Sequence, residues 1–345
     1  MSHVKAGLLP AGLARAQVVE EETKMRIAVI GGTGHIGSYL TPMLVETGHE
    51  VVCVCRGIRP PYHQHSAWNS IAYLRIDRAE EEKAGTFGGH IANINADAVI
   101  DLTCYYPSSA EQLVTALSGR IGHLLHCGTI WVHGPSGPVP TNEDQARHPF
   151  GDYGIRKAAI EAWLLEKAVT KQLPVTVLHP GHLVGPGWVP INPTGNFNVE
   201  IFAALSQGNE VRMPNFGMET LQHVHAEDVA RAFVLAVKKR DAAIGQSFHV
   251  VAASAMTMRW YAEQMAEWFN QPSRLIYLPW EEWRKSASSR DAAITEDHLR
   301  HSPHCSIEKA RRLLDYEPRY SPLAAVQESV TWLLKNSSLA GTPRA

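Results

Sequence analysis

Tyr153 and Lys157 are spaced so that they could act together in proton transfer. Side chains four residues apart lie on the same face of a helix, so the two groups would be neighbours there. A free tyrosine has a pKa near ~10 and is a poor acid–base group at neutral pH. An ammonium group beside it stabilises the phenolate and lowers that pKa. The spacing therefore predicts a site where Tyr153 exchanges a proton and Lys157 activates it.

Thr129 supplies a second hydroxyl at a position where ligands bind. It follows an apolar run at 121–127, IGHLLHC, that is typical of a buried strand. Ligands of open α/β sheets bind beyond the carboxyl ends of the strands. Thr129 is therefore expected to hydrogen-bond a reacting oxygen beside Tyr153. The alternative is a threonine that only caps a loop.

Gly31, Gly34 and Gly37 form a GxxGxxG pattern between a predicted strand at 26–30 and a predicted helix at about 35–47. Glycine permits a tight turn and lets the backbone approach a pyrophosphate, which the helix N-terminus attracts. The pattern predicts a dinucleotide site, with a ligand-free glycine-rich turn as the alternative. The contacts are expected from Gly31, Thr33, Gly34, His35, Ile36 and Gly37.

Arg56 follows the second predicted strand, at 50–55, where an enzyme that uses NAD usually has a carboxylate. Arginine can clamp a 2′-phosphate, whereas a carboxylate would repel it. The position favours NADP over NAD, unless Arg56 is only a solvated loop residue. Asp77 ends the third predicted strand and is expected either to meet the adenine or to cap a helix.

Further contacts to the dinucleotide are expected from Leu102, Thr103 and Pro180, in addition to Tyr153 and Lys157. Lys157 can hold the nicotinamide ribose. Candidate contacts to the substrate are Tyr106, His182, Asn198, Arg212 and Arg300.

Strands that alternate with helices must position these groups. The predicted strands lie at 26–30, 50–55, 71–76, 97–102, 121–127 and 175–179. This alternation indicates an α/β fold with a Rossmann-type, doubly wound parallel sheet.

The domain boundaries follow from a change in composition after Pro180. Residues 181–196 are rich in glycine, proline and asparagine, and indicate a long functional loop. The predicted Rossmann domain covers 25–180 and takes back 216–244. A smaller C-terminal α/β substrate-binding cap covers 181–215 and 245–340, and 1–24 form a disordered extension.

Composition excludes several classes of protein. The 345 residues carry 32 basic and 34 acidic side chains, a net charge of −2, so no nucleic-acid or membrane partner is expected. No apolar run reaches the ~18 residues that span a bilayer.

The five cysteines form no CxxC pair and are predicted to be free thiols in a reducing, cytoplasmic setting. His298, His301 and His304 are three apart, but Pro303 argues against one helix, and no metal site is expected.

Five segments together resemble the extended short-chain dehydrogenases, the NAD(P)-dependent epimerase/dehydratase group. They are GGTGHIG at 31–37, TIWVHG at 129–134, YGIRK at 153–157, HPGHLVGPG at 179–187 and VHAEDVARA at 224–232. The likeness runs from about Met25 to about Leu334. It implies that Tyr153 is the acid–base, Lys157 its activator and Thr129 the hydroxyl partner, with hydride transfer between nicotinamide and a sugar-like carbinol or ketone.

The sequence departs from the family pattern where that pattern binds nucleotide sugars. His179 replaces an arginine, His182 replaces an asparagine that touches the substrate, and Leu221 stands where a nucleotide-binding arginine is common. The family often forms homodimers through two helices per subunit. The helix that begins near Tyr153 is a candidate, and it carries Ile160, Trp163 and Leu164, for which packing in the core is the alternative.

Three hypotheses follow. The protein is an epimerase, dehydratase or dehydrogenase of a sugar or sugar derivative, or an NADP-dependent reductase of a non-sugar ketone. The third possibility is a non-catalytic NADP sensor or an RNA-associated protein of the same fold.

Overall fold

The computed structural model of the protein describes residues 24–336. The extension predicted for 1–24 therefore lies outside the described residues, apart from Lys24.

A seven-stranded parallel sheet forms the centre of the molecule, in the order β11-β6-β5-β4-β1-β2-β3. Its strands are β1 (Arg26–Ile30), β2 (Glu50–Cys55), β3 (Ala72–Arg75), β4 (Ala98–Asp101), β5 (His123–Cys127), β6 (Val175–Pro180) and β11 (Ser247–Val250). Most of them are apolar and buried along their length, as expected for strands covered on both faces. The sheet confirms the predicted doubly wound Rossmann-type fold.

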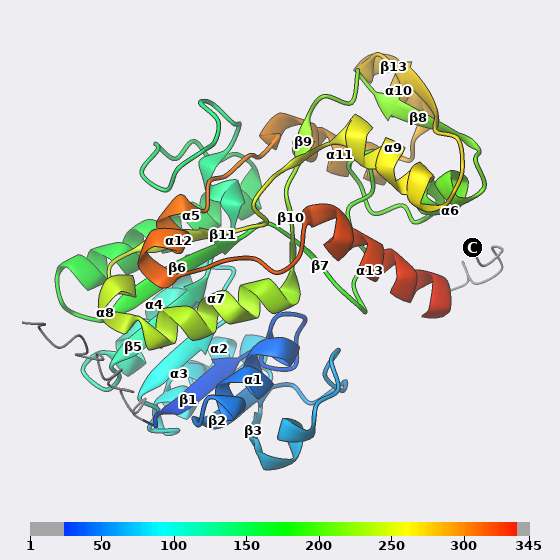
Figure 1. The fold of residues 1–345 in the computed structure, drawn as a ribbon. Helices are drawn as coiled ribbons and strands as arrows, with labels where there is room; N and C mark the ends of the chain where they lie inside the picture. The colour runs from blue at the N-terminus through cyan, green and yellow to red at the C-terminus, as the bar shows by residue number, and fades with distance from the viewer. Residues whose placement is uncertain (1–23, 337–345) are drawn as a thin grey trace, which may run out of the picture.

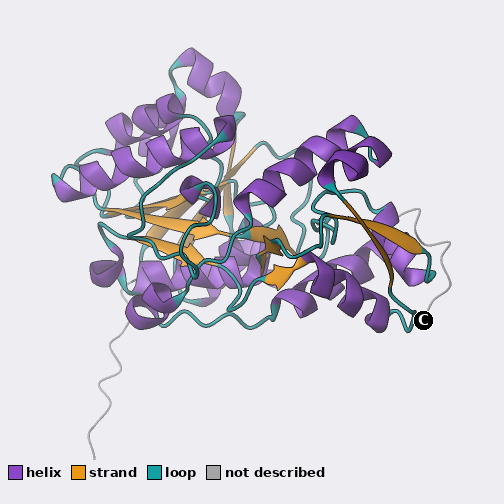
Figure 2. Cartoon of the chain, turned by 90° about the horizontal axis from the view of Figure 1, so that it is seen from above, coloured by secondary structure: helices purple, strands orange, loops and turns teal. Residues whose placement is uncertain are grey.

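Helices cover both faces of this sheet, as Figures 1 and 2 show. On one face, α1 (Gly37–Glu46), α7 (Ala226–Lys238) and α12 (Glu308–Leu314) pack around Leu40 and Phe233. On the other face, α3 (Phe87–Ala92), α4 (Pro107–Leu117) and α5 (Gly151–Val169) pack around Phe87 and Leu113. The shorter elements at the ends of the sheet are α2 (Arg78–Ala84), α8 (Arg240–Ala243), η1 (Ser66–Ser70) and η2 (Ile130–His133).

A smaller cap lies at the carboxyl ends of the strands and has a core of its own (Figure 1). Its helices are α6 (Glu200–Ser206), α9 (Met258–Trp268), α10 (Trp280–Ser286), α11 (Ser289–His301) and α13 (Pro322–Asn336). Three two-stranded pairs accompany them: β7 (His182–Val184) with β10 (His223–His225), β9 (Thr220–Leu221) with β12 (Met256–Thr257), and β8 (Glu210–Pro214) with β13 (Arg274–Leu278). Tyr261 and Phe202 are buried at the centre of the cap.

Two parts of the chain differ from the sequence-based boundaries. The segment 181–196 is not all loop, because β7 finds a parallel partner in β10 that lies about forty residues away and leaves no local pattern. The boundary at residue 245 is also displaced. β11 pairs with β6 in the central sheet and α12 packs against β11, so both belong to the Rossmann domain rather than to the cap.

Helix α5 contains the predicted dimer-forming residues. Ile160 and Leu164 are fully buried in the core beneath the sheet, and Trp163 packs partly against the same core. Ile160 and Leu164 are therefore core residues, so for these two the structure supports core packing, which the sequence left open beside a dimer surface.

All five cysteines are buried free thiols. Within residues 24–336, no helix combines the length and the apolar character needed to cross a membrane.

Candidate functional site

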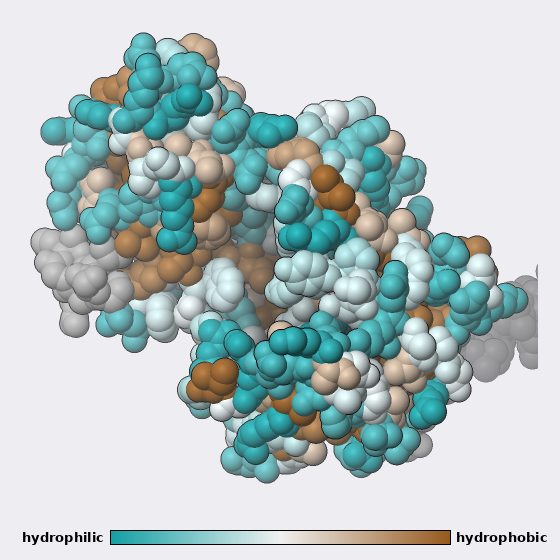
Figure 3. All heavy atoms as spheres, turned by 180° about the vertical axis from the view of Figure 1, so that it is seen from behind, coloured by the Kyte–Doolittle hydropathy of each residue, from teal (hydrophilic) through white to brown (hydrophobic). Residues whose placement is uncertain are grey.

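Two cavities lie side by side at the carboxyl ends of the central strands. The larger has a volume of about 660 Å³ and is lined by the glycine-rich loop and the ends of β2 and β3. The smaller, of about 400 Å³, lies between η2, α5, β7 and α11. Tyr105 lines both, so they form one groove. Figure 3 shows a hollow between the two lobes on one face, with apolar surface on its cap side.

The glycine-rich loop can fold tightly against the chain around it only because side chains are absent at Gly31 and Gly37. A Cβ on Gly37 would lie 2.5 Å from the carbonyl oxygen of Gly31, so this position admits glycine alone. Gly31 has φ +83°, and a Cβ there would lie 2.6 Å from Cγ2 of Thr103. The turn leads directly into the N-terminus of α1, where free N–H groups attract a pyrophosphate. The cradle fits a dinucleotide.

Most of the predicted cofactor residues lie on the groove. Gly31, Thr33, Gly34, Arg56, Asp77 and Thr103 line the larger cavity, whereas Ile36, Leu102, Tyr153, Lys157 and Pro180 line the smaller one. Asp77 also caps α2, because its Oδ1 accepts a hydrogen bond from the Ala79 N–H at 2.9 Å. Both of its expected roles therefore fit its position. Arg59 joins Arg56 in the cavity wall and was not singled out from the sequence.

His35 differs from the expectation that it contacts the dinucleotide. Its buried ring stacks on Trp188 at 4.9 Å between ring centroids, and it lines neither cavity. Burial lowers the pKa of His35 to about 3, so the ring is neutral. The stacked His35 ring holds the Trp188 indole beside the glycine-rich loop to which His35 belongs.

Tyr153, Lys157 and Thr129 all line the smaller cavity, as their predicted roles require. Although 37% of the Tyr153 side chain is exposed, burial of its hydroxyl raises its pKa above the usual value. A hydrogen bond with Thr129 opposes that shift in the pKa of Tyr153. The tyrosine therefore holds its proton at neutral pH, in contact with the threonine hydroxyl.

Lys157 is placed differently from the simple picture of a tyrosine–lysine pair. Its buried Nζ donates to the carbonyl oxygens of Cys104 and Cys127, both at 2.7 Å. Burial lowers the pKa of Lys157, and the thiols Cys127 and Cys104 oppose this. The group that lowers the Tyr153 pKa is Thr129, whereas the Lys157 ammonium is directed to the two backbone carbonyls.

A chain of buried polar groups begins at Thr129. The Thr129 backbone N–H donates to Nδ1 of His179 at 2.9 Å. Since Nδ1 accepts, the proton of the ring is on Nε2, which lies 2.8 Å from Oε1 of Glu161. Arg147 pairs with the same carboxylate at 2.7 Å. Burial alone would raise the Glu161 pKa, but His179 and Arg147 hold it well below its usual range.

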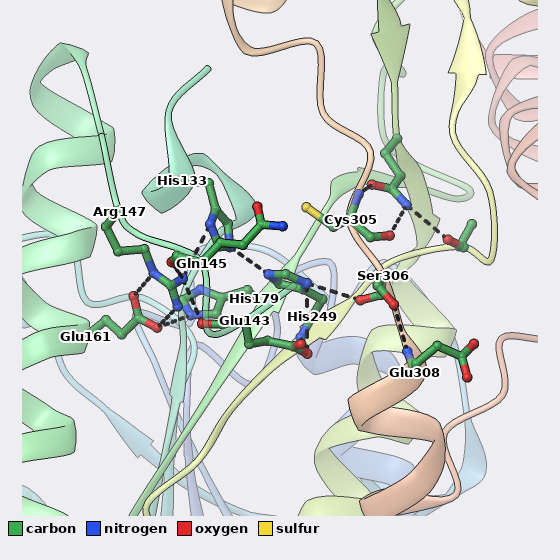
Figure 4. A network of polar contacts seen from close by, with 12 residues as sticks. His133, Glu143, Gln145, Arg147, Glu161, His179, His249, Cys305, Ser306 and Glu308 are labelled. Carbon is green, nitrogen blue, oxygen red and sulfur yellow. Dashed lines mark hydrogen bonds and ion pairs between the residues drawn. The ribbon is translucent and has the colours of Figure 1, made fainter. Parts of the chain in front are cut away.

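The chain continues to the segment that returns from the cap (Figure 4). The guanidinium of Arg147 lies 3.3 Å from Nδ1 of His133, and Nε2 of His133 lies 2.7 Å from Nε2 of His249. The other nitrogen of His249 faces the carbonyl oxygen of Ser306 at 3.1 Å. Burial lowers the pKa of His133 to about 3 and that of His249 well below its usual value, so both rings are neutral. This chain ties the Thr129 loop to the start of α12.

The predicted substrate residues are not brought together. His182 lines the smaller cavity, but Tyr106 lines the larger one, with the Arg156 guanidinium 4.9 Å from its ring centroid. Tyr106 therefore lies on the cofactor side, and its assignment to the substrate is wrong.

The other three predicted substrate residues lie outside both cavities. Asn198 accepts from the Glu200 N–H at 3.0 Å and so caps the start of α6. Arg212 is exposed on β8, and the guanidinium of Arg300 lies 4.2 Å from the ring centroid of Phe150. The sequence alone does not distinguish an arginine that faces solvent from one that lines a cavity. The expectations for Arg212 and Arg300 failed for this reason.

Further residues line the smaller cavity without having been predicted. They are Trp131, Trp188, Ile191, Phe197, Ile294, Asp297 and His298. Trp131 lies inside the family-like segment 129–134, and Trp188 directly follows the segment 179–187. Asp297 and His298 reach the cavity from α11, which no motif marks.

Three potential metal ligands, Asp101, Cys104 and His126, lie within 4.8 Å of one another. The site is unfavourable for a cation, because the Arg78 guanidinium already donates to Asp101 at 2.7 Å. The histidines His298 and His301 lie on α11, which ends at His301, so His304 is not on that helix, as Pro303 indicated.

Comparison with known proteins identifies the relatives of this fold. A sequence profile described as the NAD dependent epimerase/dehydratase family matches residues 27–251. The chloroplast stem-loop binding protein of 41 kDa b of Arabidopsis thaliana is 25% identical over 325 residues, which cover 91% of this chain and 80% of that protein. The dTDP-6-deoxy-L-talose 4-dehydrogenase (NAD(P)(+)) of Kitasatospora kifunensis is 24% identical over 87% of this chain and 97% of its own.

Among solved structures, the UDP-glucose 4-epimerase of Thermotoga maritima, determined with UDP-glucose, has a TM-score of 0.69. It is 21% identical, and the match covers 90% of this chain and 99% of that one. At this identity the likeness supports the fold.

Proposed function

Since the chain belongs to the NAD-dependent epimerase/dehydratase family, as an enzyme of that group, we propose that it transfers a hydride between a nicotinamide and a carbinol or ketone of a sugar derivative. Tyr153 would be the acid–base, and NADP the preferred dinucleotide. The observation that carries this proposal is a single groove. The glycine-rich loop lines one end, Tyr153, Lys157 and Thr129 line the other, and Tyr105 joins them.

The chain's own residues would hold the dinucleotide along this groove. The loop around Gly31 receives the pyrophosphate, and Lys157 faces the nicotinamide ribose. Arg56 and Arg59 stand beside the end of β2, which ends in Cys55 rather than in a carboxylate. Two cations beside a β2 end that lacks the usual carboxylate favour a 2′-phosphate, hence NADP, although Asp77 lines the same cavity from the end of β3. When bound, the nicotinamide supplies or accepts the hydride.

Tyr153 and Thr129 would handle the proton. Because burial raises the Tyr153 pKa, its hydroxyl carries a proton at neutral pH and can donate it to the oxygen of a bound ketone. The Thr129 hydroxyl would donate its single proton to the Tyr153 oxygen, and so stabilise the phenolate that donation leaves behind. Holding the proton favours the direction of reduction.

An epimerase and a net reductase would differ in how they hold the dinucleotide, and a binding protein would need no catalytic groups. An epimerase returns the hydride to its product and can retain the dinucleotide, whereas a net reductase must exchange it. A protein that only binds stem-loops, as the name of the Arabidopsis relative describes, has no need of the three groups around Tyr153.

The experiment that tests the proposal begins with the purified protein. Any nicotinamide released on denaturation is identified by mass, and the emptied protein is titrated with NADPH and NADH by fluorescence. Retained dinucleotide favours an internal hydride cycle, and exchangeable binding with an NADPH preference favours a reductase. No binding of either dinucleotide would contradict the proposal.

We also propose a reducing, cytoplasmic location, which the five buried free thiols support. A homodimer through α5 would have to use its outer residues, such as Ile155, whose side chain is 52% exposed.

A further inference from the structure

The cavity beside Tyr153 has an unusual balance of charge for a protein related to nucleotide-sugar enzymes. Among the described residues that line it, only Lys157 and Asp297 carry a formal charge. Lys157 already donates two hydrogen bonds, to the carbonyls of Cys104 and Cys127, both at 2.7 Å, and lies at the end that would face the nicotinamide. Asp297, on α11, is therefore the one charged group on the substrate side.

Two histidines on the substrate side are neutral. Burial lowers the pKa of His182 well below its usual value and that of His298 to about 4. Their ring centroids are 4.9 Å apart, so a charge on one disfavours a charge on the other. In residues 24–336, neither ring nitrogen of His182 has a hydrogen-bond partner, although both are buried. A ligand that reaches His182 would satisfy a buried group that otherwise goes unpaired.

The remaining walls are aromatic. Trp131, Trp188 and Phe197 line the cavity. Trp131 stacks on His301 at 4.0 Å between centroids, and Trp188 stacks on His35 at 4.9 Å, so both indoles are held in place. Fixed aromatic faces attract the apolar face of a ring, and they attract cations.

Among the described residues that line the smaller cavity, Lys157 is the only positively charged one, and no other side chain there could bind a diphosphate. Arg212 is exposed and lies 3.9 Å from Glu210, and Arg300 lies over Phe150. Phosphate recognition in proteins relies on arginine, lysine or helix N-termini, and Asp297 would repel a phosphate. The cavity of about 400 Å³ must also receive the nicotinamide end of the dinucleotide, which leaves room for one small ring.

We infer that the substrate is a single-ring alcohol or ketone without phosphate that carries a protonated amine, rather than a nucleoside diphosphate sugar. Asp297 pairs with the ammonium, and His182 bonds a ring hydroxyl. Trp131, Trp188 and Phe197 enclose the ring. The inference rests on the proposed function, since it places this ring beside Tyr153 and the nicotinamide.

The test measures binding to the NADP⁺-loaded protein by calorimetry, with glucosamine, glucose and UDP-glucose as probes. Loading keeps UDP-glucose out of the dinucleotide site. We expect glucosamine to bind about fivefold more tightly than glucose, as a half-exposed ion pair allows, and UDP-glucose to show no saturable binding. Asp297→Asn should bring glucosamine to within twofold of glucose.

The matched control is Glu296→Gln, which removes the same charge from the neighbouring exposed position of α11 outside the cavity. It should leave all three affinities unchanged. UDP-glucose binding at least as tight as that of glucosamine would overturn the inference. The absence of glucosamine binding, or equal glucosamine binding in wild type and Asp297→Asn, would overturn it as well.

The outcomes separate this inference from the proposed function. If glucosamine binds with the expected dependence on Asp297 but no amino-substituted ring alcohol is oxidised, the cavity binds an amine-bearing ring as a ligand, and the proposed function fails. If the protein turns over a nucleoside diphosphate sugar, the proposed function stands and the inference fails.

Discussion

The backbone N–H of Thr129 donates to Nδ1 of His179 at 2.9 Å, from the neighbouring strand of the central sheet. The approach of this ring requires Gly128, since a Cβ there would lie 2.3 Å from the same nitrogen. The hydroxyl that contacts Tyr153 is thus fixed from behind by a buried histidine. That histidine is anchored in turn to Glu161 at 2.8 Å.

His179→Phe should lower kcat between about 10- and 100-fold while leaving the KM for the substrate nearly unchanged, because Thr129 would no longer be held in place. It should also reduce the free energy of unfolding by ~2–4 kcal/mol, since a buried carboxylate loses one partner. Steady-state kinetics and urea denaturation measure the two effects.

His123→Asn is the control for that variant. Like His179, His123 is buried, and its ring bonds Thr176 at 2.8 Å at the opposite end of β5. Burial lowers the pKa of His123 to about 3. Its replacement should destabilise the fold without changing kcat. Equal loss of kcat in both variants would assign His179 a merely structural role.

Stability should fall as the pH drops below about 6.5. Burial lowers the pKa of His35, His123, His126, His133, His182, His223 and His249. The unfolded chain takes up protons near pH 6.5, whereas folded His133, for example, resists protonation to about pH 3. The unfolded state therefore binds more protons between these values, and folding loses ~2 kcal/mol per such histidine from pH 6.5 to 5.

Urea denaturation at pH 7.5, 6.5 and 5.5 measures this loss as a slope of the unfolding free energy against pH. His123→Asn should reduce the slope by about one proton. A free energy of unfolding that stays level across this range would contradict the assignment of neutral buried histidines.

Arg56→Asp should shift the preference from NADPH toward NADH by about tenfold or more, because it replaces a cation beside the expected 2′-phosphate with an anion. Fluorescence titration with each dinucleotide gives the ratio of dissociation constants. Lys83→Asp changes charge in the same way at an exposed position of α2 outside the cavity, and should leave that ratio unchanged. An unaltered ratio in Arg56→Asp would remove Arg56 from the site.

Gly37→Ala should weaken dinucleotide binding strongly, since its Cβ would lie 2.5 Å from the Gly31 carbonyl oxygen and force the loop apart. Gly89→Ala is the matched control, because an added Cβ there meets no atom within 4 Å. Titration with NADPH should show the loss only in the first variant. Normal binding by Gly37→Ala would mean that the loop does not form the dinucleotide cradle.

Much of the fold could be predicted from the sequence because its signals are local. Apolar runs such as 26–30 mark the strands, the glycine-rich loop and Thr129 directly follow strands, and the spacing of Tyr153 and Lys157 marks one face of helix α5. Tyr153, Lys157 and Thr129 were expected to share one site for this reason, and all three line the smaller cavity at the carboxyl ends of the strands. Arg59 and the position of β11 were missed because their neighbours come from distant segments.

The residues on the substrate side could not be predicted, because the packing of the cap decides which of them face the cavity. Asp297 and His298 reach the cavity from a helix about 140 residues beyond Tyr153, so only packing of the cap decides that they face it. Arg212 and Arg300 were expected there on charge alone, yet one lies in solvent beside Glu210 and the other over Phe150. The Lys157 ammonium was expected to activate Tyr153 directly, whereas it bonds two backbone carbonyls.

The most direct test of the account is Tyr153→Phe, which removes only the hydroxyl that would carry the proton. The measurement compares hydride transfer, followed by nicotinamide absorbance or by isomer formation, in wild type and variant with any substrate that the wild type turns over. We predict that turnover falls by at least about a thousandfold, while the dissociation constant for NADPH stays within about twofold. Turnover close to that of the wild type would contradict the assignment of Tyr153 as the acid–base, and with it the proposed mechanism.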